Sequence, residues 1–117
     1  MDSTADVPFL TAVAWLAVHE LDAMGRSEWR FFSARVPASD ETAYRVFAAV
    51  HVPAFVLVLW FLDSPSFRLG VDAFLLVHAG LHLALRDHPQ LDFDDWFSGV
   101  WIYGGALLGA LHLFLSL

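Results

Sequence analysis

The stretch Val18-His19-Glu20-Leu21-Asp22-Ala23-Met24 closes an apolar run that begins near Pro8. An ionisable side chain in such a run costs roughly 2.5 to 3.5 kcal/mol on membrane-insertion scales, so a histidine and two carboxylates there require a compensating role. The run is close to the lower limit of about 17 residues for a helix that crosses the hydrocarbon core of a bilayer. This stretch therefore predicts the end of a membrane-spanning helix that carries a polar site.

Apolar residues make up 58% of the 117-residue chain, and its mean hydropathy is +0.59. Soluble domains contain about 45 to 50% apolar residues. The excess lies in four separate runs, and a chain of this length cannot bury four such helices on all sides. We therefore expect an integral protein of the cell membrane that crosses the lipid bilayer several times.

We expect an all-α fold, a four-helix up-down transmembrane bundle that forms a single domain over residues 1–117. The expected spans are about 8–24, 43–62, 67–86 and 96–117. They are separated by residues that cap or break helices, among them Gly25, Pro37, Ser39, Ser64 and Pro89. Residues 26–35 mix arginine with tryptophan and phenylalanine, which is typical of an amphipathic segment at the membrane interface between the first two helices.

Charged residues outside the runs predict the orientation. Five arginines fall on one side of the expected bundle, and they are Arg26, Arg30, Arg35, Arg45 and Arg86. By the positive-inside rule this side is cytoplasmic, so both termini are expected outside the cell, together with Arg68. Residues 1–7 contain Asp2 and Asp6 and no basic residue, so we expect no cleaved signal peptide and a retained first helix.

The charge balance and the cysteine count exclude some functions. Thirteen acidic residues against six basic ones give a net charge of -7, which argues against nucleic acid as a partner. The chain has no cysteine, so it forms neither a disulfide nor a thiolate metal site. The sequence also offers no recognisable Ser-His-Asp set and no phosphate-binding loop.

Four histidines on three of the expected helices fall in the cytoplasmic half of the bundle, and they are His19, His51, His78 and His82. At 1.5 Å per residue, they lie roughly 6 to 12 Å from the cytoplasmic ends of their helices. Imidazoles with a carboxylate at one level suit a divalent transition metal such as zinc or iron. We predict a metal site at these histidines, with Glu20 or Asp22 as a catalytic base or as a group that orients a ligand.

Other roles for these residues stay open. A single intramembrane histidine is commonly a hydrogen-bonding strut between helices, worth on average about 0.6 kcal/mol. Glu20 lies about 100° around the helix from His19, so it can instead form a salt bridge to Arg45 or Arg86. Haem held by two histidines is the weaker cofactor alternative, because a bundle of this size can hardly provide a cavity for a porphyrin.

Further polar and small residues lie outside this cluster. Asp72 and His112 match in depth and can pair across the third and fourth helices, as a structural clasp or as one end of a proton path. Gly105 and Gly109 form a small-residue motif that favours close helix packing. Four charged residues are expected to form ion pairs at the headgroup surface, and they are Asp22, Glu28, Arg26 and Arg30.

Several segments together resemble a known family: His19-Glu20-Leu21-Asp22-Ala23, Ser27-Glu28-Trp29-Arg30, Tyr44-Arg45-Val46-Phe47 with His51-Val52-Pro53, and His78-Ala79-Gly80-Leu81-His82. Over nearly its whole length the chain is similar to small, four-span prokaryotic membrane proteins described only as a domain of unknown function. This resemblance implies a membrane fold and no particular activity. A looser likeness to membrane proteins with an H-x-x-E-E signature fails, because positions 22 and 23 are Asp and Ala.

The sequence leaves more than one function open. We favour a membrane protein that binds a metal in its histidine-rich half and uses it to activate water for reaction with a lipid-like substrate. The alternative is a non-enzymatic bundle, structural or partner-binding, in which residues 26–35 recruit anionic lipid or a protein. Proton or ion movement along histidines and aspartates is a third possibility, and it would need an oligomer because four short helices leave little room for a pore.

Overall fold

The computed structural model describes residues 4–117 of the chain. Over this range the fold is all-α, with five helices and no strand. The helices are α1 (Asp6–Gly25), α2 (Trp29–Ser33), α3 (Asp40–Trp60), α4 (Pro65–Ala84) and α5 (Trp96–Ser116). The expectation about a signal peptide rests partly on residues 1–3, which lie outside the described residues.

Four of these helices, α1, α3, α4 and α5, are long and apolar enough to cross a membrane. Their ends fall within about three residues of the spans expected from hydropathy, which is the usual precision of such boundaries. The segment expected at the membrane interface contains a helix shorter than the 26–35 range, because α2 occupies residues 29–33 alone.

Side-chain caps explain where three of the long helices begin. The backbone N–H of Thr42 donates to Ser39 Oγ at 3.2 Å, and the N–H of Phe67 donates to Ser64 Oγ at 3.4 Å. At α5 the N–H of Ser98 donates to Asp95 Oδ1 at 2.9 Å. Each cap satisfies a backbone donor that the helix itself leaves open, and it is worth about 1 kcal/mol. The caps therefore start α3 and α4 slightly before their apolar runs.

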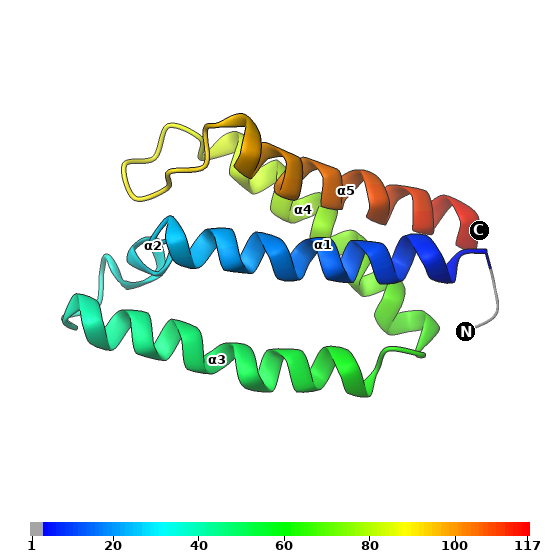
Figure 1. The fold of residues 1–117 in the computed structure, drawn as a ribbon, viewed down its shortest axis with the longest axis horizontal. Helices are drawn as coiled ribbons and strands as arrows, with labels where there is room; N and C mark the ends of the chain where they lie inside the picture. The colour runs from blue at the N-terminus through cyan, green and yellow to red at the C-terminus, as the bar shows by residue number, and fades with distance from the viewer. Residues whose placement is uncertain (1–3) are drawn as a thin grey trace.

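Figure 1 shows the start of α1 and the end of α5 at one end of the molecule, with α2 and the connection between α4 and α5 at the other end. Helix α5 packs against both α1 and α4, whereas α2 packs against α3. Four side chains that could bind a metal ion come from α1, α4 and the turn before α2, and they are His19, Glu28, His78 and His82. The packing of α1, α4 and α5 thus positions the candidate site.

Helix α5 approaches its neighbours closely because it presents glycines to them. A Cβ atom at Gly109 would lie 3.2 Å from Cδ1 of Leu75 on α4, and one at Gly104 would lie 2.7 Å from Nε1 of Trp15 on α1. At Gly105 the nearest atom would be Cδ2 of Leu75, at 3.6 Å. The packing role predicted for Gly105 and Gly109 is confirmed, and close contact of this kind stabilises helix pairs in lipid.

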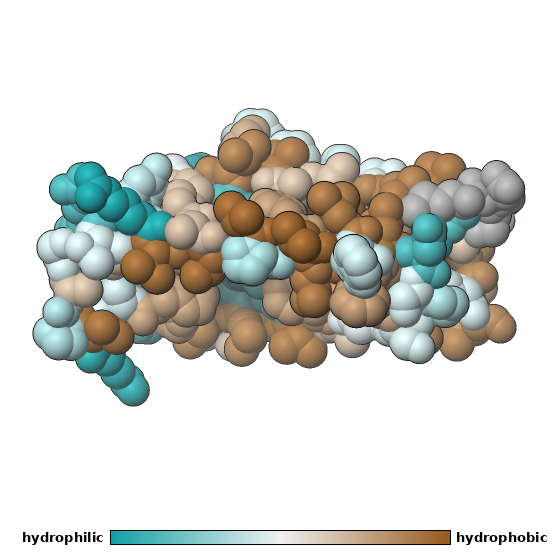
Figure 2. Space-filling view, turned by 90° about the horizontal axis from the view of Figure 1, so that it is seen from below, coloured by the Kyte–Doolittle hydropathy of each residue, from teal (hydrophilic) through white to brown (hydrophobic). Residues whose placement is uncertain are grey.

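Helix α3 is the peripheral member of the set. None of residues 40–60, all of which the structure describes, is buried. Large apolar side chains point outward along it, and Leu59 and Trp60 are 69% and 80% exposed. Figure 2 shows the face on which α3 lies, with apolar side chains over the middle and hydrophilic ones toward the ends.

Arg26 joins the end of α1 to the start of α5. Its guanidinium donates to Asp95 and lies 3.5 Å from Asp22 and 3.6 Å from Asp92. The hydrogen bond to Asp95 raises the pKa of Arg26. The backbone N–H of Ser98 and the Arg26 guanidinium lower the pKa of the Asp95 carboxyl. Cap and ion pair therefore share one carboxylate at this junction.

The close approach at Gly109 predicts a packing defect in a variant. Gly109→Val forces a side chain against Leu75 and should lower the free energy of unfolding by about 1 to 3 kcal/mol. Gly80→Val is the matched control, because a Cβ there meets nothing within 4 Å. Thermal unfolding in detergent measures both, and equal losses in the two variants would contradict the packing role.

The shared carboxylate predicts a pH dependence. Because the pKa of Asp95 is lowered in the folded protein, the ionised group stabilises the fold above its unfolded-chain pKa of about 3.9, and this stabilisation is lost as the pH falls through the folded-state pKa. Asp95→Asn should therefore flatten the acid limb of a melting-temperature profile. An unchanged acid limb would contradict this assignment.

Candidate metal site

The turn after α1 determines which side chains reach the interior. The backbone N–H of Glu28 donates to the carbonyl of Ala23 at 3.1 Å, and that of Ser27 donates to the carbonyl of Met24 at 3.3 Å. These two bonds form a Schellman motif, whose left-handed residue is Ser27 at φ 58°. Helix α1 ends at Gly25, as expected, and the positive-φ residue that reverses the chain lies two residues later.

This reversal returns Glu28 toward the bundle. Its side chain was expected in an ion pair at the headgroup surface, but it is buried, with 8% of the residue exposed. The Oε1 atom lies 3.7 Å from Nε2 of His82 on α4. Burial, together with the nearby carboxylates of Glu20 and Asp22, raises the pKa of Glu28 to about 7, although the positive charge of His51 acts in the opposite direction. Glu28 is therefore a functional candidate that the sequence did not reveal.

Three of the four predicted histidines meet Glu28. His78 and His82 lie one turn apart on α4, and their Nε2 atoms are 3.2 Å apart. The ring of His19, from α1, lies 4.6 Å from that of His78 and 5.3 Å from that of His82 between centroids. One donor atom from each of these histidines and from Glu28 falls within 4.8 Å of the others.

His19 lacks hydrogen bonds. It is 1% exposed, and neither of its ring nitrogens has a partner among the described residues. A buried polar atom without a partner costs about 1 to 3 kcal/mol. Phe93 covers the rings of His19 and His82, with centroids 5.7 and 4.8 Å away. The donors therefore lie in an apolar shell, where an additional bonding partner would be strongly favoured.

The spacing of the donors suits a small metal ion. Zinc binds imidazole nitrogen at about 2.0 to 2.1 Å, so tetrahedral ligand atoms lie about 3.4 Å apart. The distances from His82 Nε2 to His78 Nε2, 3.2 Å, and to Glu28 Oε1, 3.7 Å, lie on either side of that value. Small side-chain adjustments would bring the donors onto one centre.

His51 and Glu20 are placed together, as a separate pair beside the cluster. His51 Nε2 lies 2.6 Å from Oε2 of Glu20, and His51 Nδ1 lies 2.6 Å from the carbonyl oxygen of Phe47. Because a carbonyl only accepts, Nδ1 carries a hydrogen. The short contact to Glu20 then holds one further proton, carried either by the imidazole or by the carboxyl group. The four donors that lie together in the structure therefore include Glu28, whereas the set predicted from the sequence included His51.

The other polar residues singled out in the sequence have structural partners. Asp22 accepts a hydrogen bond from Ser98 Oγ at 2.6 Å and pairs with Arg26, so it ties α1 to α5. The expected pair of Asp72 with His112 is present, with Oδ2 and Nδ1 2.6 Å apart. The salt bridges considered for Glu20 do not form, since Arg45 pairs with Glu41 and Arg86 lies 4.0 Å from Asp87.

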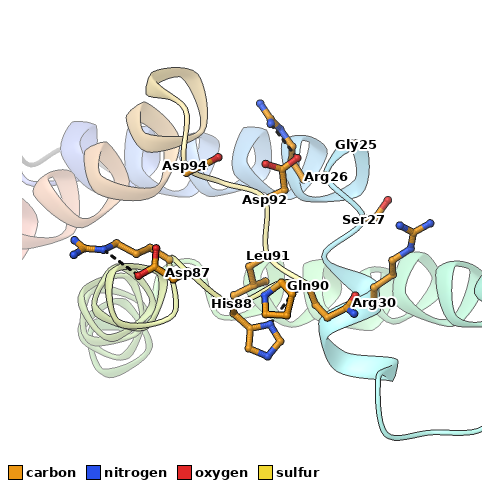
Figure 3. A pocket seen from close by; sticks show the side chains of 12 residues that line it. Gly25, Arg26, Ser27, Arg30, Asp87, His88, Gln90, Leu91, Asp92 and Asp94 are labelled. Carbon is orange, nitrogen blue, oxygen red and sulfur yellow. Dashed lines mark hydrogen bonds and ion pairs between the residues drawn. The ribbon is translucent and has the colours of Figure 1, made fainter.

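The cytoplasm-facing end expected from the arginine count holds a polar cavity of about 630 Å³. Figure 3 shows Arg26 near Asp92 on one side of it and Arg30 on the other. Three arginines and three aspartates line the cavity, so their charges balance. This end therefore presents mixed charge rather than an anion site.

Helix α2 contacts α3 through aromatic side chains. The ring of Phe32 on α2 stacks on the ring of Phe47 on α3, with 5.8 Å between centroids.

The chain belongs to a family of unknown function, DUF6713, whose profile matches residues 5–117. The resemblance to a family of unknown function is thereby confirmed. No curated protein and no solved structure matches the chain. Family membership therefore assigns no activity, and the function has to be argued from the geometry of the site.

The left-handed turn predicts opposite effects of two substitutions at one position. Ser27→Gly removes the Cβ penalty of positive φ and should raise the free energy of unfolding by up to about 1 kcal/mol. Ser27→Val should lower it by about 1 to 3 kcal/mol, because a β-branched residue strains this conformation. Chemical unfolding in detergent measures both, and effects of the same sign would refute the assignment.

Proposed function

We propose that this DUF6713 protein is an integral membrane protein that binds one divalent transition metal ion through His19, His78 and His82, with Glu28 as the fourth group of the site. The observation that carries the proposal is the convergence of four donor atoms within 4.8 Å, from two helices and the turn after α1. His19 adds weight, because both of its buried nitrogens lack a partner among the described residues. Three imidazoles and one carboxylate suit zinc or iron.

Several features support a bilayer as the surroundings. Four helices have the length and composition of membrane spans. Many large apolar side chains of α3 and α4 are exposed, which water would penalise and lipid would accommodate. In our proposal the four helices form an up-down bundle in the cell membrane, both termini face outward and the metal lies near the cytoplasmic side, where the arginines gather.

The chemistry that we propose is metal activation of water on a lipid-like substrate. A metal held by the three imidazoles keeps a position for water, whose pKa it lowers toward about 7. Glu28, 3.7 Å from His82, then lies beside that water as a base. When Glu28 also binds the metal, a tetrahedral zinc shell is full and the ion is structural. Haem between His51 and His78 fits poorly, because both ring nitrogens of His51 already contact the carbonyl oxygen of Phe47 and Glu20.

The second candidate is a non-enzymatic bundle that fixes helices or binds a partner. Polar pairs away from the cluster favour it, since Asp72–His112 and Asp22–Ser98 both join α5 to another helix. In this alternative the histidines are struts, and residues 26–35 recruit anionic lipid or a protein through Arg30, which is half-exposed beside Asp40 at 3.6 Å. The two candidates differ in whether metal is bound.

Elemental analysis of detergent-purified protein tests the metal. We expect close to one zinc or iron per chain in the native protein, and loss of at least nine-tenths of it in His19→Ala and His78→Ala. Glu28→Gln should bind more weakly by about 10- to 100-fold. His51→Ala is the matched control and should retain the metal.

Folding of every variant is checked by helix content and gel filtration. Folded native protein that was never exposed to chelator and yet holds no metal would overturn the proposal, and so would metal retained in His19→Ala/His78→Ala. Loss of metal in His51→Ala as well as in His19→Ala and His78→Ala would favour the set that the sequence suggested, which includes His51.

A further inference from the structure

An apolar groove runs between α1, α3 and α4 beside the proposed metal site. Its volume is about 580 Å³, within the range of about 300 to 1,000 Å³ that is usual for small-molecule sites. It follows α4 from Ser66 to Phe74, about 12 Å at 1.5 Å per residue. Gly70 leaves its middle open, because a Cβ there would meet nothing within 4 Å.

One end of the groove is polar. Among the described residues that line it, only Glu20, His51 and Ser66 are polar, and the first two form the hydrogen-bonded pair described above. The pair shares one proton in either protonation arrangement, so it carries no net charge. Glu20 Oε2 faces His51, and Oε1 remains as an acceptor. A neutral group that donates a hydrogen bond therefore fits this end better than an anion or a cation.

The groove and the metal site share a wall. Phe74 lines the groove, and its ring stacks on that of His78 at 5.4 Å between centroids and 26° between planes. On α1, Glu20 of the groove directly follows His19 of the cluster. A molecule whose polar end contacts Glu20 would thus have that end next to the metal ligands, with its apolar part extending along α4.

We propose that this groove binds a single-chain, neutral lipid with a hydroxyl head group, whose oxygen hydrogen-bonds to the Glu20–His51 pair. This inference rests on the proposed function, because it identifies the substrate class of the same metal site. Helix α3 has no buried residue, so the groove is bordered on that side by a helix that little else holds in place. Such a molecule would enter sideways, from the lipid.

The test uses the full chain in phosphatidylcholine nanodiscs. The probe is hexadecanol with a diazirine in mid-chain, and peptide mass spectrometry locates the cross-links. We expect labelling of groove residues on α3 and α4, such as Val58 and Val71. Unlabelled hexadecanol should compete at least tenfold better than its methyl ether or palmitate, because neither the ether nor the carboxylate supplies a neutral donor.

Two variants of α4 test whether the lipid occupies the groove. Gly70→Leu fills the groove and should lower labelling at least tenfold. Gly80→Leu is the matched control on α4, because its Cβ also meets nothing within 4 Å and it does not line the groove. Labelling that Gly70→Leu leaves unchanged would overturn the proposal.

Glu20→Leu tests recognition of the head group. It should reduce the preference for the alcohol over the methyl ether to about one, while chain binding persists. A preference that survives in Glu20→Leu would show that other residues recognise the head group, and equal competition by all three lipids in the native protein would show ordinary bilayer lipid in the groove. Either result would overturn the proposal.

Measuring the metal content of the same preparations distinguishes failure of the proposed substrate class from failure of the proposed metal function. Metal present without alcohol-selective labelling overturns the substrate class and leaves the metal site intact. Selective labelling without metal overturns the metal function and retains the groove as a lipid-binding site.

Discussion

The imidazole of His19 is the group on which the arrangement of the histidine-rich half depends. It is almost fully buried against His78, His82 and Phe93, and its nitrogens have no hydrogen-bond partner among residues 4–117. Glu20 by contrast meets His51, and Asp72 meets His112 through Oδ2, whereas the buried Nε1 of Trp101 also lacks a partner among the described residues. An unpaired polar atom in an apolar interior is expensive, and the metal ion that we propose would provide the partner that the His19 nitrogens lack.

The long helices and most of the cluster could be predicted from the sequence. Hydropathy and proline positions located α1, α3, α4 and α5, and counting residues from the helix ends brought His19, His78 and His82 to similar depth. Glu28 could not be predicted, because its burial depends on Ser27 taking a left-handed conformation that usually belongs to glycine. His51 was counted with the cluster because depth along a helix does not reveal which neighbour a side chain faces, and the structure pairs it with Glu20.

Helix α5 gives the fold its rigidity at both ends. Near the turn after α1, Ser98 donates to Asp22 and Asp95 pairs with Arg26. At the end that holds the termini, His112 pairs with Asp72 of α4. Between them, glycines bring α5 against Leu75 and Trp15. Because α1 and α4 are each fixed to α5, the cluster residues that they carry keep their relative positions even though the pair of helices has little direct backbone contact.

The lack of buried residues in α3 has a consequence for the surrounding membrane. Between helices in a bilayer there is no hydrophobic driving force comparable to that in water, since lipid tails are as apolar as leucine. In the bilayer that we propose, the distance of α3 from α1 and α4 would therefore depend on its short connections, on the Glu20–His51 contact and on the lateral pressure of neighbouring acyl chains. Tightly ordered, saturated lipid would press α3 inward, whereas disordered, unsaturated lipid would let it move aside, so the composition of the membrane would tune access to the groove.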